Sequence, residues 1–92
     1  MANRIHYEIQ IAYPNDKSDW EMERRLDERL KEAGVRRTGS GTCLFKGGSR
    51  DLEYTTILPH SFKYALRSIR AMFAAKKIKG VSIFTNKRPG RK

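Results

Sequence analysis

Side chains that can transfer protons or bind metal ions alternate along two short segments of the chain. They are His6, Glu8, Asp51 and Glu53. Carboxylates held close together raise one another's pKa or bind a divalent metal for phosphodiester chemistry. If the two segments pair as strands, these residues are weak catalytic candidates for a metal-dependent nuclease. No nucleophile or motif spacing accompanies them, so a polar sheet face is the favoured interpretation, with a homodimer through that face as an alternative.

Basic residues offer a stronger signal, because they are concentrated in one part of the sequence. The whole net charge of +10 lies between Tyr54 and Lys92, where Lys and Arg occur without any Asp or Glu. Such one-sided charge is typical of a protein that binds a polyanion, with nucleic acid first and an acidic protein or a membrane surface behind it. The expected phosphate contacts are Lys63, Arg67, Arg70, Lys76, Lys77, Lys79, Lys87, Arg88, Arg91 and Lys92.

Four of these cations follow a helical spacing. Lys63, Arg67, Arg70 and Lys77 fall on one side of a predicted helix, and its apolar stripe falls on the other. That stripe comprises Phe62, Leu66, Ile69 and Phe73. A row of cations about one turn apart can follow phosphates, which predicts electrostatic and weakly sequence-selective binding to DNA or RNA. The alternative is a solvated helix face whose last lysines favour the helix dipole.

Two aromatic residues suggest contacts with a protein partner. Phe84 is out of phase with Val81 and Ile83, which predicts an outward-pointing ring. Trp20 lies off the stripe of its helix, and covering the sheet edge is favoured over an exposed anchor. These two residues support the second hypothesis, a protein-interaction or inhibitor module of phage or accessory-genome type that docks on an acidic partner.

The periodicity of the chain predicts six elements in the order β-α-β-β-α-β. The strands are expected at residues 4–13, 38–46, 51–58 and 81–85, and the helices at 19–33 and 62–77, with Ser18 and Ser61 as N-caps. Right-handed β-α-β crossovers give a four-stranded antiparallel sheet with both helices on one face. This is the ferredoxin-like split β-α-β arrangement, which hosts many functions.

Length and composition set the remaining expectations. The 92 residues predict one domain over 1–86, followed by a basic flexible tail at 87–92. No apolar run approaches the roughly 20 residues that span a bilayer. Cys43 is the only cysteine, which excludes an internal disulfide and fits a reducing cytoplasm. With two histidines besides it, the chain is expected to carry neither a structural metal nor a cofactor.

Overall fold

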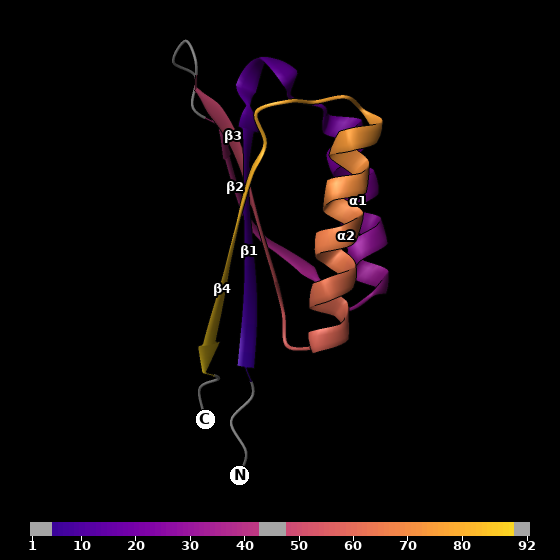
Figure 1. The fold of residues 1–92 in the computed structure, drawn as a ribbon, viewed down its shortest axis with the longest axis vertical. Coiled ribbons are helices and arrows are strands. Elements are labelled where there is room, and N and C mark those ends of the chain that lie inside the picture. Colours follow the sequence, from indigo (N-terminus) through magenta and orange to yellow (C-terminus); the bar gives the residue numbers. More distant parts are fainter. Residues whose placement is uncertain (1–4, 43–47, 90–92) are drawn as a thin grey trace.

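The computed structural model describes residues 5–42 and 48–89 and confirms the predicted order of elements (Figure 1). The elements are β1 (Ile5–Pro14), a 3-10 turn (Asn15–Lys17), α1 (Trp20–Glu32), β2 (Arg36–Thr42), β3 (Ser49–Thr56), α2 (Pro59–Ala75) and β4 (Ser82–Pro89). The strands form one antiparallel sheet in the order β2-β3-β1-β4, and both helices lie on the same face of it. The ferredoxin-like fold is therefore confirmed. Neither helix in the described ranges is long and apolar enough to cross a membrane.

The alternation of β1 divides the sheet into a buried face and an open face. Tyr7, Ile9, Ile11 and Tyr13 point towards the helices and are buried, so every second residue of this part of the strand faces the core. The intervening residues point to the opposite side, which we call the open face. Because successive side chains of a strand alternate between its two faces, this pattern fixes which side of β1 receives the helices.

Helix α1 begins one residue later than predicted. Asp19 is its N-cap, and its carboxylate accepts a hydrogen bond from the Met22 amide at 2.9 Å. The predicted cap, Ser18, instead donates to the Asn15 carbonyl of the preceding turn at 2.7 Å. The chain leaves the helix at Gly34, where φ is +86°, a left-handed conformation that favours glycine.

Both predicted ends of the second helix are wrong. Helix α2 starts with Pro59 directly after Leu58, because proline suits the first helical position. Ser61 is therefore inside the first turn, where its hydroxyl donates to the Ala33 carbonyl and ties α2 to the end of α1. The helix stops at Ala75, so Lys77, with φ of +57°, lies beyond it.

The core side of α2 is also rotated from the predicted stripe. Ile69 and Phe73 are buried as expected, but Phe62 and Leu66 are only partly buried. Ala65 and the small polar Ser68 take the central positions instead. Small residues at these positions let α2 approach its neighbours closely, a preference that a search for large apolar side chains does not detect.

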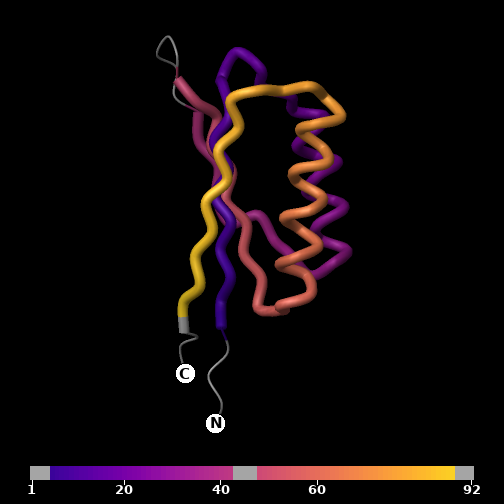
Figure 2. The backbone as a smooth tube through the Cα atoms, viewed as in Figure 1, coloured from indigo at the N-terminus to yellow at the C-terminus, as the bar shows by residue number. Residues whose placement is uncertain are grey.

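The final strand is longer than predicted. Strand β4 continues to Pro89, and therefore includes Lys87 and Arg88 of the predicted tail. Its register with β1 is unbroken from Ser82 opposite Ala12 to Pro89 opposite Ile5, so the start of β1 and the end of β4 lie side by side (Figure 2). The strand prediction failed because polar residues after Thr85 carry little β-propensity, whereas pairing with β1 extends the strand regardless.

Candidate nucleic-acid interface

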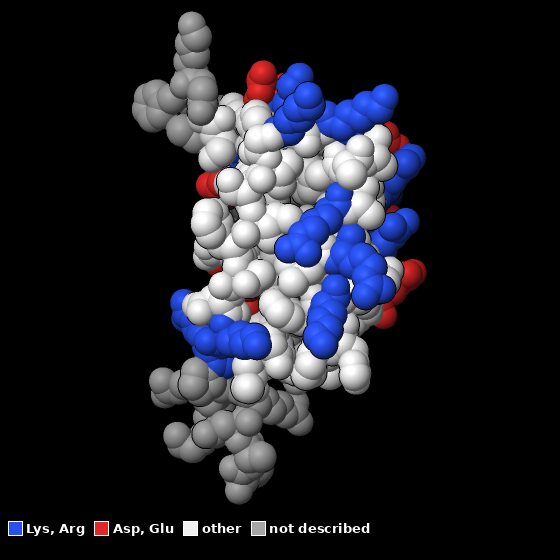
Figure 3. Space-filling model, viewed as in Figure 1, with Lys and Arg blue, Asp and Glu red and all other residues white. Residues whose placement is uncertain are grey.

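The Lys and Arg residues of α2 form one exposed row. Lys63, Arg67 and Arg70 all point away from the core, and the helix contains no acidic residue. None of the three takes part in an ion pair within residues 5–42 and 48–89. Figure 3 shows the basic side chains over α2 as a group with few acidic neighbours. Their positive charge is therefore available to an external anion.

The two cations of β4 point to opposite faces of the sheet. Lys87 is on the face that carries the helices, where its ammonium lies 5.8 Å from the ring centre of Tyr7. Arg88 is on the open face, and its Nε lies 3.3 Å from the carboxylate of Glu8. A second group of basic side chains is visible over this end of β4 in Figure 3. Lys87 thus adds a cation on the same face of the sheet as the α2 row, whereas Arg88 lies on the open face and pairs with Glu8.

Lys77 was predicted to belong to the α2 row, but it lies beyond the end of the helix. Lys76 caps the helix and approaches the carboxylate of Asp19 to 3.6 Å, so its charge is partly neutralised. Lys77 and Lys79 are exposed in the connection to β4. Arg91 and Lys92 lie outside the described residues.

The predicted acidic set does share the open face, but the register spreads it out. Glu8 lies opposite Thr55, and Ala12 lies opposite Asp51. Each carboxylate accepts a hydrogen bond from a neighbour: Glu8 from Asn86, Asp51 from Ser49, and Glu53 from Gln10 at 3.1 Å. Within the described ranges, no three His, Cys, Asp or Glu side chains are close enough together to hold a metal ion. His6 is exposed opposite Arg88.

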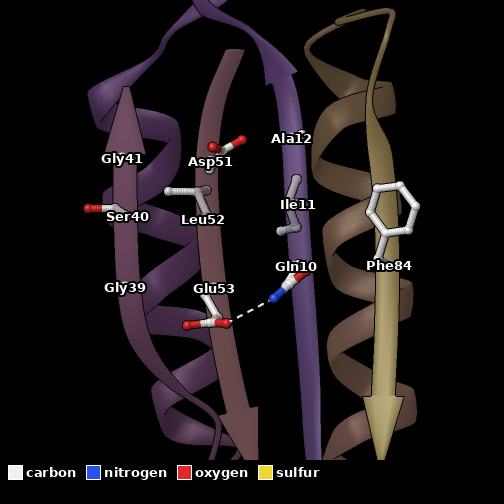
Figure 4. Close-up of a pocket in the computed structure, with 10 residues that line it drawn as sticks. All are labelled: Gln10, Ile11, Ala12, Gly39, Ser40, Gly41, Asp51, Leu52, Glu53 and Phe84. Carbon is white, nitrogen blue, oxygen red and sulfur yellow. Dashed lines mark hydrogen bonds between the residues drawn. The ribbon is translucent and has the colours of Figure 1, made fainter. Parts of the chain in front are cut away.

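A shallow hollow lies across the middle of the open face (Figure 4). The ring of Phe84 bounds it on β4, and Gly39 and Gly41 bound it on β2. Between them lie Gln10 and Glu53, joined by their hydrogen bond. Phe84 is the one aromatic residue among those that line the hollow. The sheet of a usual RNA-binding domain instead carries enough aromatic side chains to stack two or three bases.

Both predicted partner-contact residues are exposed. Phe84 is 62% exposed, as its phase in the strand predicted. Trp20 is 67% exposed, so the favoured interpretation, that it covers the sheet edge, is wrong. Its ring instead lies against the guanidinium of Arg50, 4.5 Å from the ring centre. Trp20 therefore covers one charged group rather than the apolar core.

Sequence reasoning missed the buried ion pair beneath Trp20. Glu23 is 2% exposed and binds Arg50, which is 4% exposed, through two hydrogen bonds of 2.8 and 2.9 Å. The Tyr13 hydroxyl also donates to Glu23. Burial opposes the charged form of Glu23, but the Arg50 and Tyr13 hydrogen bonds outweigh it and hold the pKa of this carboxyl below its ordinary value. The sequence does carry a signal for this pair. Glu23 lies three residues before Leu26 and seven before Leu30, and this helical spacing places its carboxylate on the apolar side of α1.

Comparisons with known proteins support the fold and no specific function. No protein-family model matches the sequence, and no curated protein is detectably similar to it. The chain is similar in structure to a dimeric ferredoxin-like protein from an uncultured marine organism, with a TM-score of 0.53 and 15% identity over 97% of this chain and 95% of that one. It is also similar to the de novo designed protein Foldit4, with a TM-score of 0.51 and 17% identity over 96% and 99% of the two chains.

Proposed function

We propose that this protein binds nucleic acid through a basic surface made of Lys63, Arg67 and Arg70 on α2 and Lys87 on β4. The observation that carries this proposal is the exposed α2 row, which has no ion-pair partner within the described residues. A row of exposed cations on a helix without any acidic residue is the pattern expected of a surface that meets a polyanion. Lys77 and Lys79, which are exposed in the connection between α2 and β4, add further positive charge to the molecule.

The mode of binding follows from the kind of side chain present. Lys63 and Arg70 are seven residues apart, which corresponds to about 10 Å along the helix axis. Cations at this spacing can contact successive phosphates and release the counterions that the phosphates had bound. The surface has no set of amide and carboxylate groups to read base edges, so we expect weak sequence selectivity.

The proposal is tested by removing charge from one helix and then from the other. The variant Lys63→Gln/Arg67→Gln/Arg70→Gln should weaken binding to labelled single-stranded DNA, duplex DNA and RNA, measured by fluorescence anisotropy over a range of salt concentrations. If the three cations contact duplex phosphates, the slope of log K against log salt should become shallower by roughly 2–3.

The matched control is Arg24→Gln/Arg25→Gln/Arg29→Gln on α1, which removes the same net charge from the other helix. Equal loss of affinity in the two triple variants would show that only net charge matters. Undetectable binding of the unaltered protein to all three nucleic acids would reject the proposal, provided that circular dichroism shows a folded chain.

The same protein and nucleic-acid samples also test two other hypotheses, a homodimer and a metal-dependent nuclease. The exposed Phe84 and the dimeric state of the marine protein favour a homodimer through the open face, which sedimentation would reveal as a doubled mass. Cleavage of the labelled strands that requires a divalent metal and Glu53 would support the nuclease hypothesis. An acidic protein partner and a cytoplasmic location remain predictions.

A further inference from the structure

The two edges of the sheet differ in how well they could receive another strand. Strand β2 carries a register shift between Arg37 and Gly39, and has a second glycine at Gly41. Strand β4 has eight residues in unbroken register with β1, and no other described strand pairs with its outer edge. Bulges normally protect an edge from further pairing, and the described length of β4 has none. Its Ser82–Asn86 part also carries no charge to protect it.

The helical layer does not fully cover β4. On the face that carries the helices, Ile9 and Ile11 of β1 are buried, but their β4 neighbours Thr85 and Ile83 are exposed and half-buried respectively. The side chains of a strand added to β4 would therefore meet solvent and the flank of α2 on this face.

That flank of α2 is positively charged. The Phe62 ring stacks on Tyr7 of β1 with ring centres 4.7 Å apart, which shows the side of α2 that faces β1. A helix turns about 100° per residue, so Lys63 lies next to Phe62 on the outer side, and Arg70 lies next to Leu66 on the same side. Lys87 supplies a third cation from β4 itself. Figure 3 shows basic side chains over both elements on one face of the molecule.

We propose that the β4 edge binds an extended acidic segment of a protein partner, which adds a fifth strand to the sheet. Backbone groups of Ser82–Arg88 would supply the hydrogen bonds, as in other cases of strand addition. Alternate side chains of the added strand would face Lys63, Arg70 and Lys87, where Asp or Glu is favoured. Those on the other side would lie beside the exposed ring of Phe84, where an apolar residue is favoured.

Charge selects this partner over a second copy of the chain. Pairing two β4 edges would bring together two Lys87 residues and two rows of α2 cations, and like charges in such proximity oppose association. Nucleic acid can neutralise the cations but lacks the peptide groups that continue a sheet. The proposal goes beyond nucleic-acid binding and shares Lys63, Arg70 and Lys87 with it, so the two partners should compete.

The experiment uses a synthetic eight-residue peptide of alternating Glu and Val, with a Lys/Val peptide as the charge control. We expect the Glu/Val peptide to bind at least tenfold more tightly than the Lys/Val peptide. Hydrogen exchange should slow at least tenfold at alternate amides of Ser82–Arg88, those that point away from β1. Lys63→Gln/Arg70→Gln should reduce the affinity several-fold.

Backbone pairing is tested by changing the peptide alone, which leaves the folding of the protein untouched. Two further Glu/Val peptides carry N-methyl groups on the Glu residues or on the Val residues. One of them should lose at least tenfold in affinity and the other much less, because only alternate amides of an added strand face its neighbour. Equal affinities for the two, or unchanged exchange in β4, would overturn the proposal.

The remaining outcomes separate this inference from the proposed function. If the protein binds nucleic acid but not the Glu/Val peptide, the addition of an acidic strand is rejected and the proposed function is not. Protection of β4 amides together with a doubled mass, in the absence of peptide, would show that a second copy occupies the edge. If the protein binds the peptide but no nucleic acid, the proposed function is rejected and the basic surface is a binding site for an acidic protein segment.

Discussion

The two helices lie on the same face of one sheet, but they use charge in opposite ways. Helix α1 carries five acidic and four basic residues, and two of its arginines pair with glutamates four positions away. Helix α2 carries three basic residues and no acidic one. Several charges of α1 are thus used in ion pairs within the molecule, whereas those of α2 form no ion pair among the described residues. Counting charges over a whole chain does not reveal this distinction.

The helices also attach to the sheet differently. Helix α1 combines an apolar stripe with the buried Glu23–Arg50 pair and with a 2.6 Å hydrogen bond from the Tyr54 hydroxyl to Asp27. Helix α2 attaches through Ala65, Ile69 and Phe73, and has no ion pair to the sheet among the described residues. The α1 attachment should therefore respond to charge mutations and pH far more than the α2 attachment.

The largest effect is expected from Glu23→Gln, which breaks the buried pair. Arg50 would keep its charge while losing its counter-charge, a change that typically costs about 3–5 kcal/mol of unfolding free energy. Chemical denaturation measures this loss. The matched control is Glu28→Gln, which breaks the exposed pair with Arg24 and should cost about 0–1 kcal/mol. Similar losses in both variants would contradict the contrast between buried and exposed pairs.

A second, smaller effect is expected at alkaline pH. Burial, followed by the hydrogen bond to Glu23, raises the pKa of Tyr13 to about 12, from an ordinary value of 10.0. The unfolded chain loses this proton first, so the stabilising contribution is complete below pH 10 and disappears as pH rises towards 12. The resulting loss of unfolding free energy should be on the order of 2 kcal/mol.

Parallel titrations of tyrosinate absorbance and circular dichroism measure this effect. Burial and the Asp27 hydrogen bond also raise the pKa of Tyr54, so both groups should resist titration until α1 detaches. In the Tyr13→Phe variant, the stability of the fold, followed by circular dichroism, should decline less steeply above pH 10. An identical alkaline profile in that variant would rule out Tyr13 as a contributor.

The smallest effect concerns the start of α1. Asp19→Ala removes the side-chain oxygen that accepts from the Met22 amide and should cost about 1 kcal/mol, as N-cap removals generally do. Asp19→Asn keeps an acceptor and loses the charge beside Lys76, so it should cost less. Ser18→Ala serves as the control because Ser18 is not the cap. A larger loss for Ser18→Ala than for Asp19→Ala, by thermal or urea denaturation, would restore the predicted cap.

Local patterns predicted the elements well and their ends poorly. The alternation of apolar residues in β1 and the helical spacing of Met22, Leu26 and Leu30 are local patterns that indicate a strand and a helix, because each pattern marks a face that is buried. Ser18 and Asp19 are neighbouring residues of types that both favour the N-cap position, so residue type alone does not decide at which of them the helix begins. The ends of α2 and β4 depend on packing and pairing with distant segments, which local patterns do not contain.

The sequence by itself determined the βαββαβ order, the buried residues of β1, the outward ring of Phe84 and the concentration of cations after Tyr54. These features follow from periodicity and composition, which are local properties. Only the tertiary structure decided that Arg50 belongs to the core, that Arg88 lies beside Glu8, and that the β4 edge is regular. Each of these depends on strand register, and register is fixed by contacts between residues far apart in the chain.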